Sequence, residues 1–257
     1  MESLLVDRSD TGVVSITMNQ PEKKNAINHS MFEELLAIFE EVTNREEDRV
    51  LVLTGAGGNF SAGADLTPSG SSERHILSSM RFYGSVGLAL HNLPKPTLAK
   101  VRGVAAGAGL NLGLGCDLIL ASEEARFSEI FARRGLSLDV GGSWLLPRLV
   151  GLHKAKELAL LADVIPAHEA EKMGLINRVV PDAELDALVD DWAERLAAGP
   201  PLALSQSKRM LNNAFSYGLA EAMEVEAAAQ SVNIPSEDCR EGMVAFFQKR
   251  QPASKLL

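Results

Sequence analysis

The amino-acid sequence predicts an α/β protein with an all-helical C-terminal region. Short apolar segments typical of buried strands alternate with helical patterns over most of the 257-residue chain. From about residue 182 the strand signals stop and only helical patterns follow. Alternating strands and helices are typical of the α/β class. We therefore expect a core at residues 1–198 and a helical region at residues 199–257, which begins at the break Gly199-Pro200-Pro201.

Each expected element has its own local signal. Val13–Met18 alternates as a strand does, and residues 50–54, 97–101 and 117–121 are short and apolar. A capping box that begins at Ser30 predicts a helix start. This helix has one apolar face, formed by Met31, Leu35, Ile38, Phe39 and Val42. In the C-terminal region, helices are expected at residues 186–197, 202–214, 219–232 and 236–249.

Two connecting segments differ from this pattern. Residues 67–80 contain the polar, breaker-rich stretch Pro68-Ser69-Gly70-Ser71-Ser72. It predicts a mobile loop, which is either a lid over a neighbouring site or a plain surface loop. The small residues between the strands at 97–101 and 117–121 predict a helix packed tightly in the core.

Composition excludes several classes of function. The net charge of −9 argues against nucleic acid as a partner, although a local basic patch could still hold an anion. No apolar stretch reaches the ~20 residues of a membrane helix, and the first residues do not form a signal peptide. Cys116 and Cys239 give no disulfide framework. We therefore expect a cytoplasmic protein that binds neither nucleic acid nor membrane.

Two glycine-rich segments are the most informative part of the sequence. They are Phe60-Ser61-Ala62-Gly63-Ala64-Asp65-Leu66 and Gly103-Val104-Ala105-Ala106-Gly107-Ala108-Gly109. Both are nearly free of catalytic side chains, as in a site built from backbone N–H groups. Two amides that converge on one carbonyl oxygen form an oxyanion hole. For either segment alone, tight packing is the alternative interpretation.

Together with four further motifs, these segments resemble the crotonase (enoyl-CoA hydratase/isomerase) superfamily over nearly the whole chain. The further motifs are Asn19-Gln20-Pro21-Glu22-Lys23-Lys24-Asn25-Ala26, Leu93-Pro94-Lys95-Pro96, Gly141-Gly142-Ser143-Trp144-Leu145-Leu146-Pro147-Arg148-Leu149-Val150-Gly151 and Ala170-Glu171-Lys172-Met173-Gly174-Leu175-Ile176. Each is moderately specific alone, and their order and spacing make the resemblance strong.

The resemblance implies a spiral core of repeated ββα units and a C-terminal helical region that makes homotrimers or hexamers. It implies an acyl-CoA thioester as the substrate, with coenzyme A as part of that substrate and no separate cofactor. The thioester oxygen would lie between the N–H groups of Ala64 and Ala108. An enolate that forms there is stabilised by fixed amide donors. No metal is expected, because the histidines lack metal-ligand spacing.

The resemblance also assigns residues to coenzyme A. Lys23 and Lys24 match the position that contacts the nucleotide, and a solvated loop charge is the alternative. The backbone that cradles the adenine matches Ala62, Asp65 and Leu66, although Asp65 also suits a structural turn. Near the end of the chain, Phe246 and Lys249 match a segment that reaches coenzyme A, and helix packing is the default role for Phe246.

Departures from the family pattern decide the chemistry. Hydratases of this family use two glutamates to activate water, and Asn111 and Phe131 stand at those two positions. We therefore expect Asn111 and Phe131, with Trp144, to line the acyl pocket; core packing is equally plausible for Trp144. Glu129 lies two residues before Phe131, which stands at the position of the second glutamate. On a strand, the side chains of Glu129 and Phe131 would therefore lie on the same face. Glu129 could therefore substitute for the missing glutamate, but we expect it at the surface or in a salt bridge.

Asp139 is the remaining candidate acid/base. The run from Asp139 to Arg148 resembles the enoyl-CoA and ring-epoxide-CoA isomerases of the family, which use this aspartate for proton transfer. Apolar neighbours on both sides would raise its pKa toward neutrality. The alternative is an N-cap for a helix beginning near Ser143, a role that Ser143 itself could fill.

These expectations favour an isomerase that moves a double bond in an enoyl-CoA through an enolate, with Asp139 as the acid/base. A hydratase with non-standard water activation is a second reading. A CoA-thioester-binding protein with little activity is a third.

Overall fold

The computed structural model of the chain describes residues 2–67 and 75–252. The strands are β1 (Leu4–Arg8), β2 (Val13–Met18), β3 (Val50–Gly55), β4 (Thr97–Val101), β5 (Val104–Ala106), β6 (Leu118–Ser122), β7 (Arg126–Ser128), β8 (Ile165–Pro166) and β9 (Arg178–Val180). The core helices are α1 (His29–Asn44), α2 (Ile76–Asn92), α3 (Gly107–Gly115), α4 (Gly142–Val150), α5 (Leu152–Leu161), α6 (Ala167–Lys172) and α7 (Asp182–Ala197), with short 3₁₀ helices η1 (Pro21–Lys23) and η2 (Ile130–Arg134). The C-terminal helices are α8 (Pro201–Asn212), α9 (Leu219–Asn233) and α10 (Glu237–Gln248).

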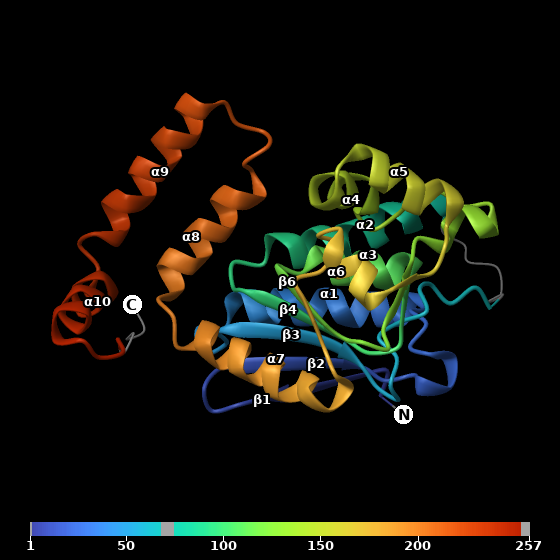
Figure 1. Cartoon of the computed structure of the whole chain (residues 1–257), viewed down its shortest axis with the longest axis horizontal. Coiled ribbons are helices and arrows are strands. Elements are labelled where there is room, and N and C mark those ends of the chain that lie inside the picture. Colours follow the sequence, from blue (N-terminus) through green and yellow to red (C-terminus); the bar gives the residue numbers. More distant parts are fainter. Residues whose placement is uncertain (1, 68–74, 253–257) are drawn as a thin grey trace.

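Two sheets form the centre of the core. The larger has six strands in the order β1-β2-β3-β4-β6-β9 (Figure 1). Only its first pair, β1 and β2, is antiparallel. The smaller sheet has the order β5-β7-β8. The α/β prediction is confirmed, since helices connect the parallel strands of the larger sheet.

Helices cover both faces of the larger sheet. On one face, α7 packs Leu185 and Val189 onto residues of β3, β4 and β6 such as Val52 and Leu120. On the other face, α1, α2 and α3 share a larger apolar core with the remaining strand residues. Because α3 lies inside this core, all nine of its residues are buried. The predicted small-residue helix is therefore confirmed.

Two local predictions were wrong. Helix α1 begins at His29, and its cap is Asn28, whose side chain accepts from the Met31 N–H at 2.9 Å. The predicted capping box at Ser30 therefore does not form the N-terminus of this helix. Helix α2 begins at Ile76, so the loop predicted for residues 67–80 ends earlier. The stretch predicted as a lid or surface loop, residues 68–72, lies outside the described residues.

The three C-terminal helices lie largely apart from the core (Figure 1). Helices α8 and α9 contain no buried residue, and α10 contains only Ala245. Polar contacts tie α8 to the core: Lys208 pairs with Asp117 at 2.8 Å, and Asn212 Nδ2 donates to the His91 carbonyl at 3.0 Å. In the part of the chain described here, no helix combines the length and apolar character needed to cross a membrane.

Candidate active site

The two glycine-rich segments lie side by side. The Ser61 N–H donates to the Val104 carbonyl at 2.9 Å, and the Ala106 N–H donates back to the Ser61 carbonyl at 2.9 Å. These bonds form a short parallel bridge between the segments. The sequence predicted that both segments build one site, and the backbone pairs them.

The first segment is also paired on its other edge. The Ile27 N–H donates to the Gly63 carbonyl at 2.8 Å, and the Asp65 N–H donates to the Ile27 carbonyl at 2.9 Å. Successive N–H groups of an extended chain point to opposite sides. The N–H of Ala64 therefore points away from Ile27, and it donates no hydrogen bond to any described residue. Ala64 is exposed, so this donor is available to a ligand.

The second predicted donor belongs to Ala108, the second residue of α3, which is 2% exposed. N–H groups in the first turn of a helix have no partner within the helix. Gly63 is the point of contact with this turn: a Cβ built there would lie 2.9 Å from the Ala106 oxygen and 3.7 Å from the Ala108 nitrogen. Gly63 also has a φ of +99°, which favours glycine. Gly63, which precedes Ala64, thus makes a tight backbone contact with the turn that contains Ala108.

A pocket of about 690 Å³ opens beside Ala64. It is lined by parts of α1 and α2, by residues of the first glycine-rich segment and by the loop before α4. The lining residues predicted from the sequence are Lys23, Ala64, Asp65, Leu66 and Asp139. One cavity therefore contains both the amide-bearing segment and the candidate acid/base.

The backbone around Asp139 is strained and firmly held. Val140 has a φ of +46°, which is unusual for a β-branched residue, and Gly141 has a φ of +88°. The Asp139 carbonyl accepts from the Gly142 N–H and from Asn111 Nδ2, both at 2.9 Å. Burial raises the pKa of the Asp139 carboxyl to about 6, as the sequence predicted in direction.

The structure contradicts the alternative role of Asp139 as a helix cap. The N-cap of α4 is Gly141, and no side chain caps this helix. Ser143 lies inside the helix and does not cap it either. Oδ1 of Asp139 is buried without a hydrogen-bond partner among the described residues. The carboxyl group is therefore available for chemistry in the pocket.

Glu129 was expected at the surface or in a salt bridge, and this was wrong. Strand β7 ends at Ser128, so Glu129 is not on a strand, and its exposed fraction is 1%. Burial first, and then the charge of Asp139, raise the pKa of Glu129 to about 8, while the Asn111 amide offsets part of the rise. The Asn111 Nδ2 is nevertheless committed to the Asp139 carbonyl, and neither Glu129 oxygen has a hydrogen-bond partner among the described residues.

Asn111 and Phe131 lie behind the pocket rather than in its lining. Asn111 is buried and holds the Asp139 carbonyl from α3. The Phe131 ring lies next to Gly107, the first residue of α3. A Cβ built on Gly107 would lie 3.6 Å from this ring. Both residues support the site, and neither supplies the carboxylate that a two-glutamate hydratase needs.

Trp144 does not join the predicted acyl pocket. The guanidinium of Arg148 lies 3.8 Å from the centre of its ring, and the His91 ring meets it edge-on at 5.2 Å. It lines separate hollows with His91. One of these hollows is also lined by Val140 and Gly141, which directly follow Asp139 in the chain.

The residues predicted to bind coenzyme A divide into two groups. In the first, Lys23 pairs with Asp65 at 2.7 Å, and Asp65 also accepts from the Thr67 N–H and Oγ1 at 2.9 and 2.5 Å. The Lys23 contact first, and then those of Thr67, lower the pKa of Asp65 to about 2. Lys24 is exposed and makes no ion pair with a described residue, and its carbonyl accepts from the Ala62 N–H at 2.8 Å. Lys24 is thus the more available cation.

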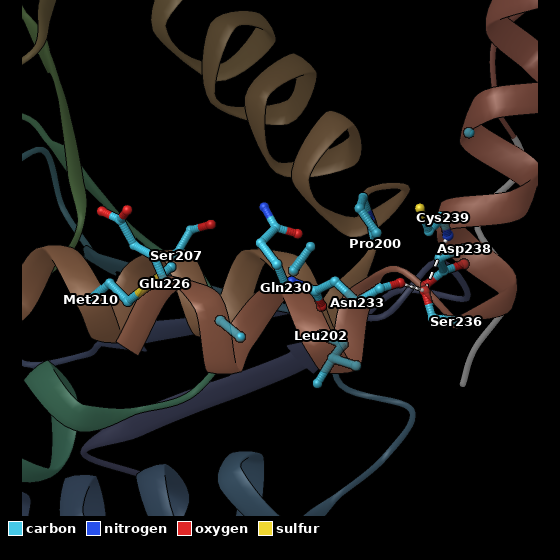
Figure 2. Close-up of a pocket in the computed structure, with 13 residues that line it drawn as sticks. Pro200, Leu202, Ser207, Met210, Glu226, Gln230, Asn233, Ser236, Asp238 and Cys239 are labelled. Atoms are coloured by element: carbon cyan, nitrogen blue, oxygen red, sulfur yellow. Dashed lines mark hydrogen bonds between the residues drawn. The ribbon is translucent and has the colours of Figure 1, made fainter. Parts of the chain in front are cut away.

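The second group, Phe246 and Lys249, lies at the end of α10, apart from the core (Figure 1). A hollow of about 590 Å³ lies among α8, α9 and α10. In Figure 2, Glu226 and Ser207 lie toward one end of this hollow, and Asp238 and Cys239 lie toward the other. None of the described residues lining it was predicted as part of the site. The structure therefore does not bring α10 to the pocket of its own chain.

Sequence reasoning also missed the aromatic wall of the pocket. His29 of α1 and Tyr83 of α2 line it, with His29 Nδ1 3.3 Å from the Tyr83 hydroxyl. Phe32 stacks on Tyr83 with ring centres 4.6 Å apart. No motif marks these positions, because only the packing of α1 against α2 brings them together. Within residues 2–67 and 75–252, no group of His, Cys, Asp and Glu side chains could hold a metal ion.

One pocket thus combines the exposed Ala64 segment with the Asp139 carboxyl, as an enzyme site can. Residues 8–255 match the enoyl-CoA hydratase/isomerase family, and the chain belongs to it. It is 37% identical to 1,2-epoxyphenylacetyl-CoA isomerase of Escherichia coli over 257 residues, 98% of each chain. It is 34% identical to short-chain-enoyl-CoA hydratase of Clostridium acetobutylicum, covering 93% of this chain and 92% of that one. Enoyl-CoA hydratase of Bacillus anthracis has the same fold, with a TM-score of 0.94, 32% identity and full coverage of both chains.

Proposed function

We propose that this enzyme is an isomerase that moves the double bond of an enoyl-CoA thioester. The observation that carries the proposal is a single pocket that contains both Asp139 and the segment bearing the Ala64 amide. At the two positions where hydratases of the family carry glutamates, this chain has Asn111 and Phe131. Asp139 is thus the ionisable group best placed to move a proton on the substrate.

The proposed reaction uses one carboxyl twice. The Asp139 carboxylate takes a proton from C2 of a 3-enoyl-CoA, and the electron pair moves onto the thioester oxygen. The N–H groups of Ala64 and Ala108 stabilise the resulting dienolate, and one such donor is worth about 3–4 kcal/mol in a comparable site. The protonated carboxyl then returns the proton to C4, which gives the conjugated 2-enoyl-CoA. A raised pKa suits this role, because the same group must both accept and release the proton near neutral pH.

A hydratase is the second candidate, and the position of Glu129 favours it. Glu129 and Asp139 give the site two interacting carboxyls, which could together activate a water molecule in place of the usual glutamate pair. The relative from Clostridium acetobutylicum is named as a hydratase. A third candidate, a thioester-binding protein with little activity, requires that neither carboxyl moves a proton on the substrate.

One assay separates the three candidates. The purified protein is mixed with 3-enoyl-CoA in one reaction and with 2-enoyl-CoA in another, and products are followed by mass and by the absorbance of the conjugated thioester. An isomerase converts the first substrate to a conjugated product of unchanged mass. Addition of water to the second substrate would contradict the proposal in favour of the hydratase. No turnover of either substrate, with binding retained, would favour the binding protein.

We further propose that Lys23 and Lys24 contact the phosphates of coenzyme A and that the chain forms a trimer or hexamer through α8–α10. The exposed apolar residues of these helices, such as Leu211, Phe215 and Leu219, support an interface. Since α10 lies apart from the core of its own chain, Phe246 and Lys249 could reach coenzyme A only in a neighbouring subunit.

A further inference from the structure

The turn that carries Asp139 passes from the pocket to a neighbouring hollow. Asp139 lines the pocket, whereas Val140 and Gly141 line the hollow, which has a volume of about 450 Å³. Helix α2 lines both cavities as well. The chain therefore leaves the pocket at the bond between Asp139 and Val140, and a displacement of Val140 would move Asp139.

Helix α3 holds this turn through Asn111. The buried Asn111 side chain donates from Nδ2 to the Asp139 carbonyl at 2.9 Å, and the Gly142 N–H donates to the same carbonyl at 2.9 Å. A Cβ built on Gly142 would lie 2.4 Å from Asn111 Nδ2, so the turn packs directly on this amide. The main chain of Asp139 is thus fixed by contacts that leave its carboxyl group free of them.

Helix α2 holds the turn through Gly87. A Cβ built on Gly87 would lie 2.8 Å from Cγ1 of Val140 and 3.1 Å from the Val140 carbonyl oxygen. Carbon atoms in contact lie about 3.5–4.0 Å apart, so position 87 has no space for a side chain. Val140 is 5% exposed and has a φ of +46°. A β-branched residue keeps such a conformation only where its surroundings impose it, and the close contact with α2 is one of these surroundings.

We propose that Gly87 is a positioning residue for Asp139: because it has no side chain, Val140 can pack against α2, and this contact keeps the Asp139 carboxyl in the pocket. The inference rests on the proposed function, in which Asp139 is the base. Gly87 does not line the pocket itself, so it acts through Val140. A methyl group at position 87 would displace the turn, and the adjoining hollow leaves room for this shift without unfolding.

Separate measurement of kcat and KM for Gly87→Ala tests the proposal. The added methyl group requires a shift of roughly 1 Å at Val140, and a misplacement of this size can lower a rate about 100-fold. We expect isomerase kcat to fall about 10- to 100-fold and KM to change little, because the residues that line the pocket are unchanged. Gly84→Ala is the matched control: Gly84 lies three positions earlier on α2, a Cβ there meets nothing within 4 Å, and kcat should equal that of the wild type.

A compensating substitution shows whether residue 87 acts through Val140. Val140→Ala removes Cγ1, the atom closest to the added methyl group. The double variant Gly87→Ala/Val140→Ala should therefore recover most of the kcat that Gly87→Ala loses. A double variant as slow as Gly87→Ala would overturn the proposal, and so would an unchanged kcat or a loss that appears only in KM. If melting curves show that Gly87→Ala does not fold, the double variant must have a higher kcat than Val140→Ala alone, and a lower one would overturn the proposal.

Crystal structures of the wild type, Gly87→Ala and Gly84→Ala give a readout that does not depend on the reaction. In Gly87→Ala, Val140 should move away from α2, and the Asp139 carboxyl should shift by roughly 1 Å relative to the Ala64 N–H. Gly84→Ala should superpose on the wild type. An unmoved Asp139 in Gly87→Ala would overturn the inference whatever the protein catalyses. A wild type without isomerase activity contradicts the proposed function instead, and the crystal structures still decide whether Gly87 positions Asp139.

Discussion

Replacing Asp139 by Asn removes the proposed base and keeps nearly the same shape. General acid–base catalysis is typically worth ~10²–10⁴ in rate, so isomerase turnover should fall by about that factor. Thioester affinity should change little, because the amides of Ala64 and Ala108 are untouched. The pocket around residue 139 therefore predicts a variant that binds substrate and does not turn it over.

The same substitution should stabilise the protein at high pH. Burial raises the pKa of Asp139 from 3.8 to about 6, and one pKa unit corresponds to about 1.4 kcal/mol. Between these two values the folded protein retains a proton that the unfolded chain has lost, so wild-type stability falls as pH rises and levels off above pH 6. Asn does not ionise. Asp139→Asn should thus gain up to about 3 kcal/mol over the wild type between pH 4 and pH 7, which is several degrees in melting temperature.

The assay is a series of melting curves from pH 4 to pH 8, combined with turnover of 3-enoyl-CoA at pH 7. The expected result is a loss of activity together with a pH-dependent gain in stability. A structural role for the carboxylate predicts the reverse, with a protein that melts earlier and still turns over. A stable Asp139→Asn variant with full isomerase activity would refute the mechanism, and a melting difference that does not vary with pH would refute the assigned pKa.

Three further predictions concern the rest of the molecule. Replacing Lys23 and Lys24 together by Ala should weaken coenzyme A binding roughly 10- to 100-fold at low salt, since charge-assisted hydrogen bonds contribute about 1.5–3 kcal/mol; unchanged affinity in a titration would contradict the assignment. Gly63→Ala should lower kcat/KM by about 10²–10³, because the added Cβ displaces the Ala64 amide. Gly84→Ala, whose Cβ meets nothing within 4 Å, is its control and should behave as the wild type. Sedimentation at micromolar concentration should show a trimer or hexamer, and a monomer would exclude assembly through α8–α10.

The sequence predicted best what depends on local pattern. The strands β2, β3 and β4 are each five or six residues long and mostly apolar, so a short stretch of sequence is enough to identify them. Helix α3 is buried on all sides, and its small residues make this burial visible in the sequence. The paired amide segments could also be predicted, because glycine-rich backbone is needed wherever N–H groups must face a ligand. The start of α1 could not be chosen locally, since Asn28 and Ser30 are both good caps and only the extended backbone at Asn28 decides between them.

What the sequence missed depends on contacts between distant segments. Glu129 is an ordinary charged residue after a short strand, and nothing near it in the sequence shows that α3 and the loop at Asp139 enclose it. The Lys23–Asp65 pair joins residues 42 positions apart, and the His29–Tyr83 pair joins residues 54 apart. Trp144 was expected either in the acyl pocket or in the core, whereas its neighbours are Arg148 on its own helix and His91 at the end of α2.

The strip from Ser61 to Asp65 has a consequence for how this enzyme acquires activity. Its backbone is hydrogen-bonded to Ile27 on one side and to Val104 and Ala106 on the other. Three separate stretches of chain must therefore come together before the Ala64 N–H is held in a fixed orientation. Closing these long loops costs entropy that only the assembled core repays. A partly folded chain, even one with most of its helices formed, would lack the proposed oxyanion hole. In the folded protein the donors are already fixed when substrate arrives, and no reorganisation of the backbone is needed at the moment of reaction.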